Sequence, residues 1–339
     1  MSRYGQRSRL TGTSEANSIN KWYGGGFVNV RGSRGLIFGG YYAASPYYSN
    51  SIQYNTIAST GNYTSFGTLA ANTYVGGAGA STTRGIYTSG FAGVYPASTA
   101  IQYVTIATTG NAASFGTYGG GAVFNISQCS NDTRAVFAGG YDNNTGYVAT
   151  SHYVTIATTG NSTSFGTLFR GQTMFGGGNS TTRGLNFGGD AGGCSSYTNS
   201  IYYITIATTG NWQSFGTLSQ VLTTATGLSS ATRVVIAQGQ YSPCSSPYHT
   251  SNMEYVTTAS AGNGTNFGTL SRIGTQAAGV DNGILGNIVA GYITSSSTLS
   301  DAIIQITIAS AGNGTTMSGL TVMALTAGVG TSDCHGGLA

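Results

Sequence analysis

Short stretches of apolar and polar residues recur along the chain in patterns that predict β-strands. In the clearest stretch, residues 153–158 are mostly β-branched or aromatic, and residues 164–168 resume the pattern after Gly160 and Asn161. Such residues are typical of strands, and a Gly-Asn pair supplies the positive φ angles of a tight primed turn. The stretch lacks apolar residues at helical spacing, so it predicts an antiparallel hairpin.

The hairpin pattern returns at a nearly constant interval. Its Gly-Asn pairs begin at Gly61, Gly110, Gly160, Gly210, Gly262 and Gly312. Successive pairs are 49–52 residues apart, and a fixed period of this length is typical of repeat proteins. The chain has 339 residues, more than one simple core usually organises. Repeats remove that limit, because each unit buries its faces against its neighbours.

Each repeat contains four segments of strand length. A glycine-rich segment such as residues 74–79 comes first, a strand that ends in Gly-Gly, such as residues 35–40, comes second, and the hairpin supplies the other two. We expect the first-strand glycines where backbones approach closely around an axis. Four short antiparallel strands in about fifty residues are typical of a propeller blade. The sequence therefore predicts an all-β, six-bladed propeller over residues 22–339, preceded by a short arm over residues 1–21.

The strands resemble a kelch repeat in their Gly-Gly end, in a Tyr on the third strand and in an aromatic residue on the fourth. These aromatic residues are Phe66, Phe115, Phe165, Phe215 and Phe267. The pattern Tyr-Val-Thr-Ile-Ala-Thr-Thr-Gly-Asn-x-x-Ser-Phe-Gly-Thr is more specific, and it resembles repeats in structural proteins of tailed bacteriophages, notably cyanophages. The resemblance covers residues 22–335. The kelch resemblance implies a propeller, and the phage resemblance implies a component of the virion.

First strands outnumber the predicted blades, which bears on how the ring closes. Residues 321–339 form a partial seventh repeat with a first strand over residues 321–330, and residues 22–30 are a second candidate for the same place. A ring usually closes when one terminus completes the blade of the other, because this protects the edge strands. The sequence leaves both candidates open.

Charge is divided unevenly between the arm and the rest of the chain. The formal net charge is +4, and residues 1–21 carry +3 of it. The charged residues of the arm are Arg3, Arg7, Arg9, Glu15 and Lys21. The remaining eight Arg and seven acidic residues leave +1, without the basic stripe that nucleic acid requires. We therefore expect the arm to dock on an acidic protein of the particle, and we expect no nucleic acid partner.

The sequence also bears on location. The first residues lack the apolar core of a secretory signal, and no apolar run approaches the length of a membrane span. We therefore expect no membrane insertion, assembly in the host cytoplasm and a final place in the virion.

An arginine recurs at the turn between the first and second strands, at Arg34, Arg84, Arg134, Arg183 and Arg233. Two interpretations are open. The guanidinium groups could form a ring that binds an anion or a carboxylated partner. Alternatively, each arginine caps carbonyl groups at its own turn, which the periodic placement favours.

The connection between the second and third strands changes from repeat to repeat, whereas both short turns stay constant. Antiparallel order places all the variable loops on one face. Their tyrosines are Tyr41, Tyr47, Tyr48, Tyr95, Tyr141, Tyr147, Tyr197, Tyr241 and Tyr248. Loops rich in Tyr, Ser, Gly and Asn are typical of adaptable recognition surfaces, so we expect this face to bind a host glycan or a protein. The alternative is ordinary variation of surface loops.

Catalytic and cofactor sites are not predicted. The histidines His152, His249 and His335 fall in unrelated parts of the repeat, and the acidic residues are dispersed. Residues 142–146 resemble the start of a calcium loop, but no acidic residue closes the loop, so we interpret them as a turn. The glycine clusters lack the Lys-Ser/Thr of a phosphate loop. We expect no enzyme activity, no metal and no cofactor.

These observations favour a non-enzymatic structural or adhesion protein of a tailed phage, in the tail, a fibre or the baseplate. Its partners would be other virion proteins, with multiple copies in each particle. Two alternatives remain: a capsid decoration protein, and a lectin-like, carbohydrate-binding bacterial propeller.

Overall fold

The computed structural model describes residues 33–338 except 44, 46, 175, 194–195, 242–248 and 294–295. The regular elements of these residues are β-strands, and none of them is a helix. The prediction of an all-β chain built from four-stranded antiparallel sheets is confirmed for this part of the chain. None of its segments is a helix long and apolar enough to cross a membrane.

Six sheets of the described chain share one strand order, which runs from the innermost strand outward. Sheet 1 contains β29 (Val329–Ser332), β1 (Arg34–Phe38), β2 (Ser49–Thr56) and β3 (Thr64–Thr73). Sheet 2 contains β4 (Gly77–Ala80), β5 (Arg84–Thr88), β6 (Ala100–Thr105) and β7 (Ala113–Thr117). Sheet 3 contains β9 (Ser127–Ser130), β10 (Arg134–Ala138), β13 (Thr150–Thr155) and β14 (Thr163–Thr167).

The other three sheets repeat this order. Sheet 4 contains β15 (Gly176–Asn179), β16 (Arg183–Phe187), β17 (Ser200–Thr205) and β18 (Gln213–Thr217). Sheet 5 contains β19 (Thr226–Ser229), β20 (Arg233–Gln240), β21 (His249–Thr257) and β22 (Thr265–Thr269). Sheet 6 contains β24 (Ala278–Asp281), β25 (Leu285–Val289), β27 (Thr298–Thr307) and β28 (Thr315–Leu325), and is extended by β23 (Gly274–Thr275) and β26 (Tyr292–Ile293). A small separate sheet joins β8 (Val123–Phe124), β11 (Tyr141–Asp142) and β12 (Gly146–Tyr147).

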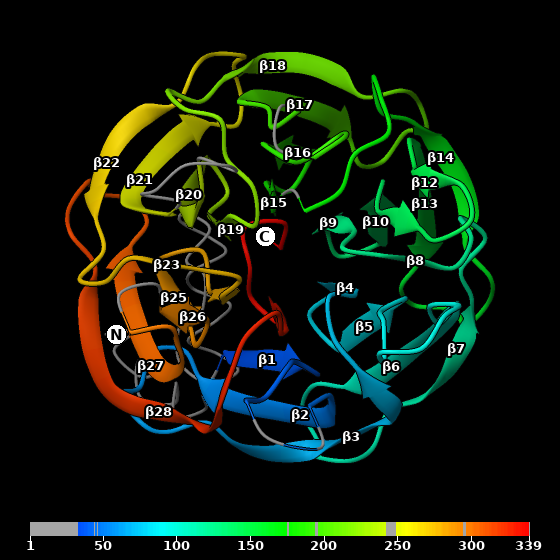
Figure 1. Ribbon diagram of the computed structural model, residues 1–339, viewed down its shortest axis with the longest axis horizontal. Helices are drawn as coiled ribbons and strands as arrows, with labels where there is room; N and C mark the ends of the chain where they lie inside the picture. Colours follow the sequence, from blue (N-terminus) through cyan, green and yellow to red (C-terminus); the bar gives the residue numbers. More distant parts are fainter. Residues whose placement is uncertain are drawn as a thin grey trace, which may run out of the picture.

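The sheets lie around a common centre, with strands such as β4, β9, β15 and β19 innermost and β3, β7, β14, β18, β22 and β28 on the rim (Figure 1). A cluster of buried apolar side chains lies between each sheet and the next. Between sheets 1 and 2, for example, Phe38 packs near Tyr87. A further cluster, which includes Ile37 and Val289, joins sheet 6 to sheet 1. The last sheet therefore packs on the first as each other sheet packs on its successor.

The C-terminal segment supplies the innermost strand of sheet 1. β29 pairs antiparallel with β1, with Ile37 opposite Gly330. The predicted first strand over residues 321–330 is therefore wrong at its start, because residues 321–325 instead prolong β28 along β27. Residues 22–30, the other candidate, lie outside the described residues, as does the arm with Arg3, Arg7, Arg9 and Lys21.

The predicted primed turn at Gly-Asn is also wrong. Neither Gly160 nor Asn161 has a positive φ. The hairpin instead turns earlier, where Thr158 N donates to Thr155 O at 3.2 Å. The Gly-Asn pair is thereby free to contact the neighbouring sheet.

The glycines of the innermost strands lie where backbones approach closely, as the sequence predicts. A Cβ atom on Gly177 would lie 2.1 Å from Gln128 O, one on Gly227 would lie 2.0 Å from Gly177 O, and one on Gly330 would lie 2.1 Å from Gly279 O. Real Cβ atoms do not approach carbonyl oxygens this closely, so a larger residue here would force the innermost strands apart.

We expect Gly330→Ala to lower the free energy of unfolding by about 1–3 kcal/mol, because the new methyl group overpacks the contact with β24. The measurement is urea unfolding of the purified chain. Gly110→Ala is the matched control, since nothing lies within 4 Å of a Cβ at Gly110. Equal unfolding midpoints for the two variants would contradict the close approach of β29 to β24.

Candidate recognition face and central cavity

The repeated arginines fasten each sheet to the next. Arg134 Nη1 donates to Ile206 O at 3.3 Å and to Ala207 O at 2.6 Å, both in the hairpin turn of sheet 4. Its guanidinium carbon lies 4.4 Å from the ring centroid of Tyr153, which meets Phe165 edge-on. We call this arrangement the arginine clasp. It recurs at Arg34, Arg84, Arg183 and Arg233.

The arginine clasp corrects one sequence interpretation. The capped carbonyl groups belong to the next sheet and not to the turn that carries the arginine, because the two sheets pack closely enough for the side chain to reach across. Charge-assisted hydrogen bonds and a ring contact hold each guanidinium. The arrangement favours a structural role over an anion-binding ring.

The Gly-Asn pair forms a second fastening at the same interfaces, which we call the Gly-Asn clasp. Gly160 N donates to Phe115 O at 2.8 Å, and Asn161 Oδ1 accepts from Thr117 N at 2.9 Å. The outer strand of sheet 2 is thereby hydrogen-bonded to sheet 3, which protects its edge. Equivalent bonds are made by Asn111, Asn211, Asn263 and Asn313.

The interface between sheets 6 and 1 is fastened differently. Leu285 stands where the other sheets carry the arginine, and Gln305 stands in place of the tyrosine. Gln305 Nε2 donates to Ile57 O at 3.2 Å and to Asn287 Oδ1 at 2.9 Å, and Asn287 Nδ2 lies 3.4 Å from Ile57 O. A neutral pair of amides therefore replaces the arginine and its tyrosine at this interface.

The opposite face carries the variable loops, and its aromatic side chains form one continuous series. Neighbouring ring centroids in the series are 4.6–6.2 Å apart. We call it the aromatic arc; it contains Tyr47, Tyr41, Tyr48, Tyr74, Phe91, Tyr95, Phe124, Tyr141 and Tyr147. The arc spans the loops of sheets 1, 2 and 3. At its far end, the Tyr147 hydroxyl donates to Asp190 Oδ2 at 3.3 Å.

The structure brings most of the predicted loop tyrosines together. Tyr47 and Tyr95 are 50% and 48% exposed, so their rings are accessible from solvent. Tyr197 and Tyr241 have no ring contact with the arc in the described residues, and Tyr241 packs on the core between sheets 4 and 5. Tyr248 lies outside the described residues.

Three members of the arc were not predicted from the sequence: Tyr74, Phe91 and Phe124. Tyr74 and Phe124 lie in the connection before an innermost strand, and Phe91 follows the second strand of sheet 2. Tyr74 and Phe91 pair through their backbones, and so do Phe124 and Tyr141. The sequence could have indicated Tyr74 and Phe124, because these aromatic residues stand at the position where sheets 4 and 5 have Thr173 and Thr223.

A ring of backbone hydrogen bonds, open between Thr224 and Gln276, lies beside the arc residues Tyr74 and Phe124. Its six residues precede the innermost strands and have φ angles of 53–55°: Val75, Asn125, Met174, Thr224, Gln276 and Ala327. Asn125 N donates to Val75 O at 2.7 Å, and Val75 N donates to Ala327 O at 3.1 Å. Left-handed φ angles are strained for residues other than Gly, so this ring is held by its neighbours.

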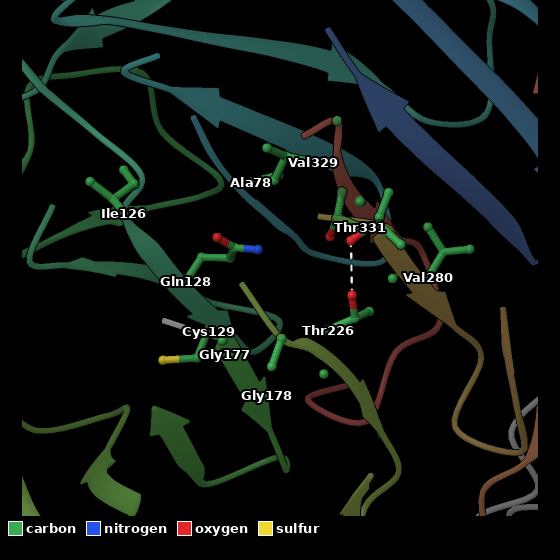
Figure 2. A pocket seen from close by; sticks show the side chains of 18 of the residues that line it. Ala78, Ile126, Gln128, Cys129, Gly177, Gly178, Thr226, Val280, Val329 and Thr331 are labelled. Carbon is green, nitrogen blue, oxygen red and sulfur yellow. Dashed lines mark hydrogen bonds between the residues drawn. The ribbon is translucent and has the colours of Figure 1, made fainter. Parts of the chain in front are cut away.

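A central cavity of about 160 Å³ follows this ring between the innermost strands. The second position of these strands carries only Gly or Ala, except for Gln128. Figure 2 shows the Gln128 amide extending into the cavity. A polar cavity of this size has room for about ten water molecules.

The other end of the cavity is filled by the C-terminal residues, which we call the plug (residues 333–338). His335 is buried, and its Nδ1 accepts from Gly337 N at 3.1 Å, so its Nε2–H donates to Ala80 O at 3.0 Å. Asp281 accepts from Ser229 N at 2.9 Å and from Gly336 N at 3.3 Å. The plug thereby contacts sheet 2 at Ala80 and sheet 6 at Asp281, and His335 Nε2 also lies 3.3 Å from Ser130 Oγ of sheet 3.

Of the titratable groups in and around the plug, His335 and Asp281 are buried and have pKa values shifted in opposite directions. Burial lowers the pKa of His335 to about 4, and burial raises the pKa of Asp281 to about 7. Between these values the folded chain keeps a proton on Asp281 that the unfolded chain loses, so this group lowers stability as pH rises. From about pH 4 to about pH 6.5, His335 is protonated in the unfolded chain and neutral in the folded chain. This group therefore raises the free energy of unfolding as pH rises.

The remaining sequence candidates have structural roles. Asp142 Oδ1 accepts from Asn144 N at 2.8 Å and from Thr145 N at 3.0 Å, which is the expected turn. No group of His, Cys, Asp and Glu that could hold a metal occurs among the described residues. His335 belongs to the plug, and His152 packs edge-on against Tyr118.

No protein-family model matches this chain, and no curated protein matches it significantly.

We expect Arg134→Ala to lower the free energy of unfolding by about 1–2 kcal/mol, because it removes charge-assisted hydrogen bonds to the partly buried Ile206 O and the exposed Ala207 O of sheet 4. Chemical denaturation measures the change. Arg170→Ala, at an exposed position outside the clasps, should change stability by less than about 0.5 kcal/mol. An equally small effect at Arg134 would contradict the clasp.

We expect Asp281→Asn to make stability rise with pH between about pH 4.5 and pH 6.5, because it removes the contribution of Asp281 that opposes that of His335. The slope should increase by at most about 1.4 kcal/mol per pH unit. Thermal and urea unfolding across this range measure the profile. Asp142→Asn in a surface loop is the control, and parallel profiles for the two variants would disprove the assignment to the plug.

Proposed function

We propose that the chain is a six-bladed, kelch-like β-propeller in which each of the six sheets is one blade. The arrangement of the sheets around a centre supports this proposal (Figure 1). So does the apolar cluster between sheet 6 and sheet 1. The pairing of β29 with β1 supplies the closure that a propeller requires.

We infer that the protein is a non-enzymatic structural or adhesion component of a tailed phage, in the tail, a fibre or the baseplate. The observation that carries this inference is the difference between the two faces. On one face, the constant turns form the clasps between neighbouring sheets. The other face presents the aromatic arc, in which Tyr47 and Tyr95 are half-exposed. Rigid aromatic side chains on a fixed framework suit recognition. The resemblance of the hairpin pattern to phage structural proteins supplies the setting.

The basic arm has a separate role in this proposal. Residues 1–21 carry most of the net charge, and the rest of the chain is nearly neutral. The arm docks on an acidic protein of the particle, a contact that salt weakens. The loop face then points outward, toward the host.

Two other functions compete with a tail protein. A capsid decoration protein would use the same arm and face on the head of the particle. A lectin-like bacterial propeller is favoured by one specific observation, the aromatic arc, which does not depend on a virion.

The test of the proposed function is the composition and behaviour of purified particles. Mass spectrometry should find the chain in them, and antibody labelling should place it on the tail. Deletion of residues 1–20 should leave a folded protein that fails to incorporate, because the basic arm is lost. Tyr95→Ala should leave incorporation intact and reduce host adsorption. Absence of the chain from particles would refute the phage assignment, and normal incorporation of the deletion variant would refute the role of the arm.

A further inference from the structure

We propose that Tyr41, Tyr48, Tyr74 and Tyr95 form a binding site for a neutral carbohydrate chain, with Tyr74 at its centre. We call these residues the tyrosine quartet. The inference rests on the proposed function for its biological setting, but its chemistry belongs to the quartet alone.

The quartet is compact although its members come from three separate segments. The ring centroids of Tyr48 and Tyr74 are 5.1 Å apart and nearly parallel, at 23°. The ring centroid of Tyr41 lies 6.1 Å from that of Tyr74 and 5.8 Å from that of Tyr48. Tyr95 joins through Phe91, whose ring centroid is 4.6 Å from that of Tyr95 and 5.9 Å from that of Tyr74.

The hydroxyl groups of the quartet are not used by the described part of the fold. Burial raises the pKa of Tyr74. No described residue is hydrogen-bonded to these four hydroxyl groups. By contrast, the Tyr42 hydroxyl bonds to Ser49, and the Tyr87 hydroxyl bonds to Thr73. The quartet therefore offers donors and acceptors that the fold does not use.

The framework holds the quartet in place. Tyr41 exchanges backbone hydrogen bonds with Thr326 at 2.8 and 3.1 Å, and Tyr74 exchanges them with Phe91 at 3.0 Å. Tyr48 packs on Gly93, which has a φ of +83°, and a Cβ on Gly93 would lie 2.4 Å from Tyr48 Cε2. A site fixed in this way loses little conformational entropy on binding.

The composition of the quartet selects the class of ligand. Residues 39–49 and 89–99 contain no charged residue, so these loops supply no cation for a sulfate, carboxylate or phosphate group. Single-stranded nucleic acid also requires a basic groove beside its stacking rings. The negative face of an aromatic ring attracts the C–H groups of a sugar, while phenol hydroxyl groups pair with its hydroxyl groups. A neutral saccharide satisfies both features at once, whereas the core of a protein interface is mainly apolar.

The test measures binding of neutral oligosaccharides, hexose and N-acetylhexosamine chains, to the purified full chain by NMR titration and calorimetry. Sulfated and sialylated forms of the same chains are included. Tyr48→Ala should weaken binding about tenfold, as expected for loss of an aromatic anchor. Tyr74→Phe keeps the ring and removes only the hydroxyl, so it should weaken binding about threefold to tenfold. Phe169→Ala is the matched control, because Phe169 is exposed and stacks on Tyr202 outside the arc.

Neutral chains should bind, the two quartet variants should bind more weakly, and the control should bind like the parent, all with unchanged melting temperatures. Absence of binding to any neutral chain, preference for the anionic forms, or equal binding by the quartet variants would each overturn the proposal. Loss of host adsorption by the quartet variants without saccharide binding would indicate a protein partner and would also overturn it. These outcomes are independent of whether the chain occurs in particles, so failure of the proposed function is recognised separately.

Discussion

The structure depends on the fastening of each sheet to the next. A four-stranded sheet has two broad faces, and apolar clusters between neighbouring sheets bury them. The arginine clasp and the Gly-Asn clasp add hydrogen bonds at the same interfaces, where turn carbonyl groups and an outer strand edge would otherwise be unpaired. One short pattern of residues therefore serves both the hairpin and the contact with its neighbour. This double use explains why the pattern varies so little along the chain.

The interface between the last and first sheets has no arginine clasp in the described residues. At this interface Asn287 and Gln305 hold Ile57 O with neutral amides. The C-terminal residues add β29 to sheet 1 and then fill one end of the central cavity. His335 and Asp281 are buried at this plug. Contacts between sheet 6, the plug and the start of the described chain thus join the last sheet to the first.

The clasps lie on one face of the molecule, the face of the constant turns. Arginine and asparagine side chains on the turn side are hydrogen-bonded to neighbouring sheets, so the same residue types are needed in each repeat. The loop side carries neither the arginine clasp nor the Gly-Asn clasp in the described residues; its bonds between sheets are those of the backbone ring that includes Val75 and single contacts such as that of Tyr147 with Asp190. Its loops can therefore differ, and in sheets 1 to 3 they differ toward aromatic residues. The aromatic arc is therefore a local feature of sheets 1 to 3.

The sequence by itself determined the hairpins, the period of the repeat, the four-stranded antiparallel sheets and the division between constant turns and variable loops. Each of these follows from residue types at short spacing, where local physics is sufficient. Most of the loop tyrosines were also predictable, since antiparallel order places successive loops on one face. The propeller itself stays a proposal supported by these features.

Only the tertiary structure decided how the repeats contact one another. The targets of Arg134 and Asn161 lie in neighbouring repeats, so spacing within one repeat could not identify them. The same holds for Tyr74, whose place at the centre of the quartet comes from three segments folded together. The closing strand was undecided for a similar reason, because both termini contain suitable residues and only packing against sheets 1 and 6 distinguishes them.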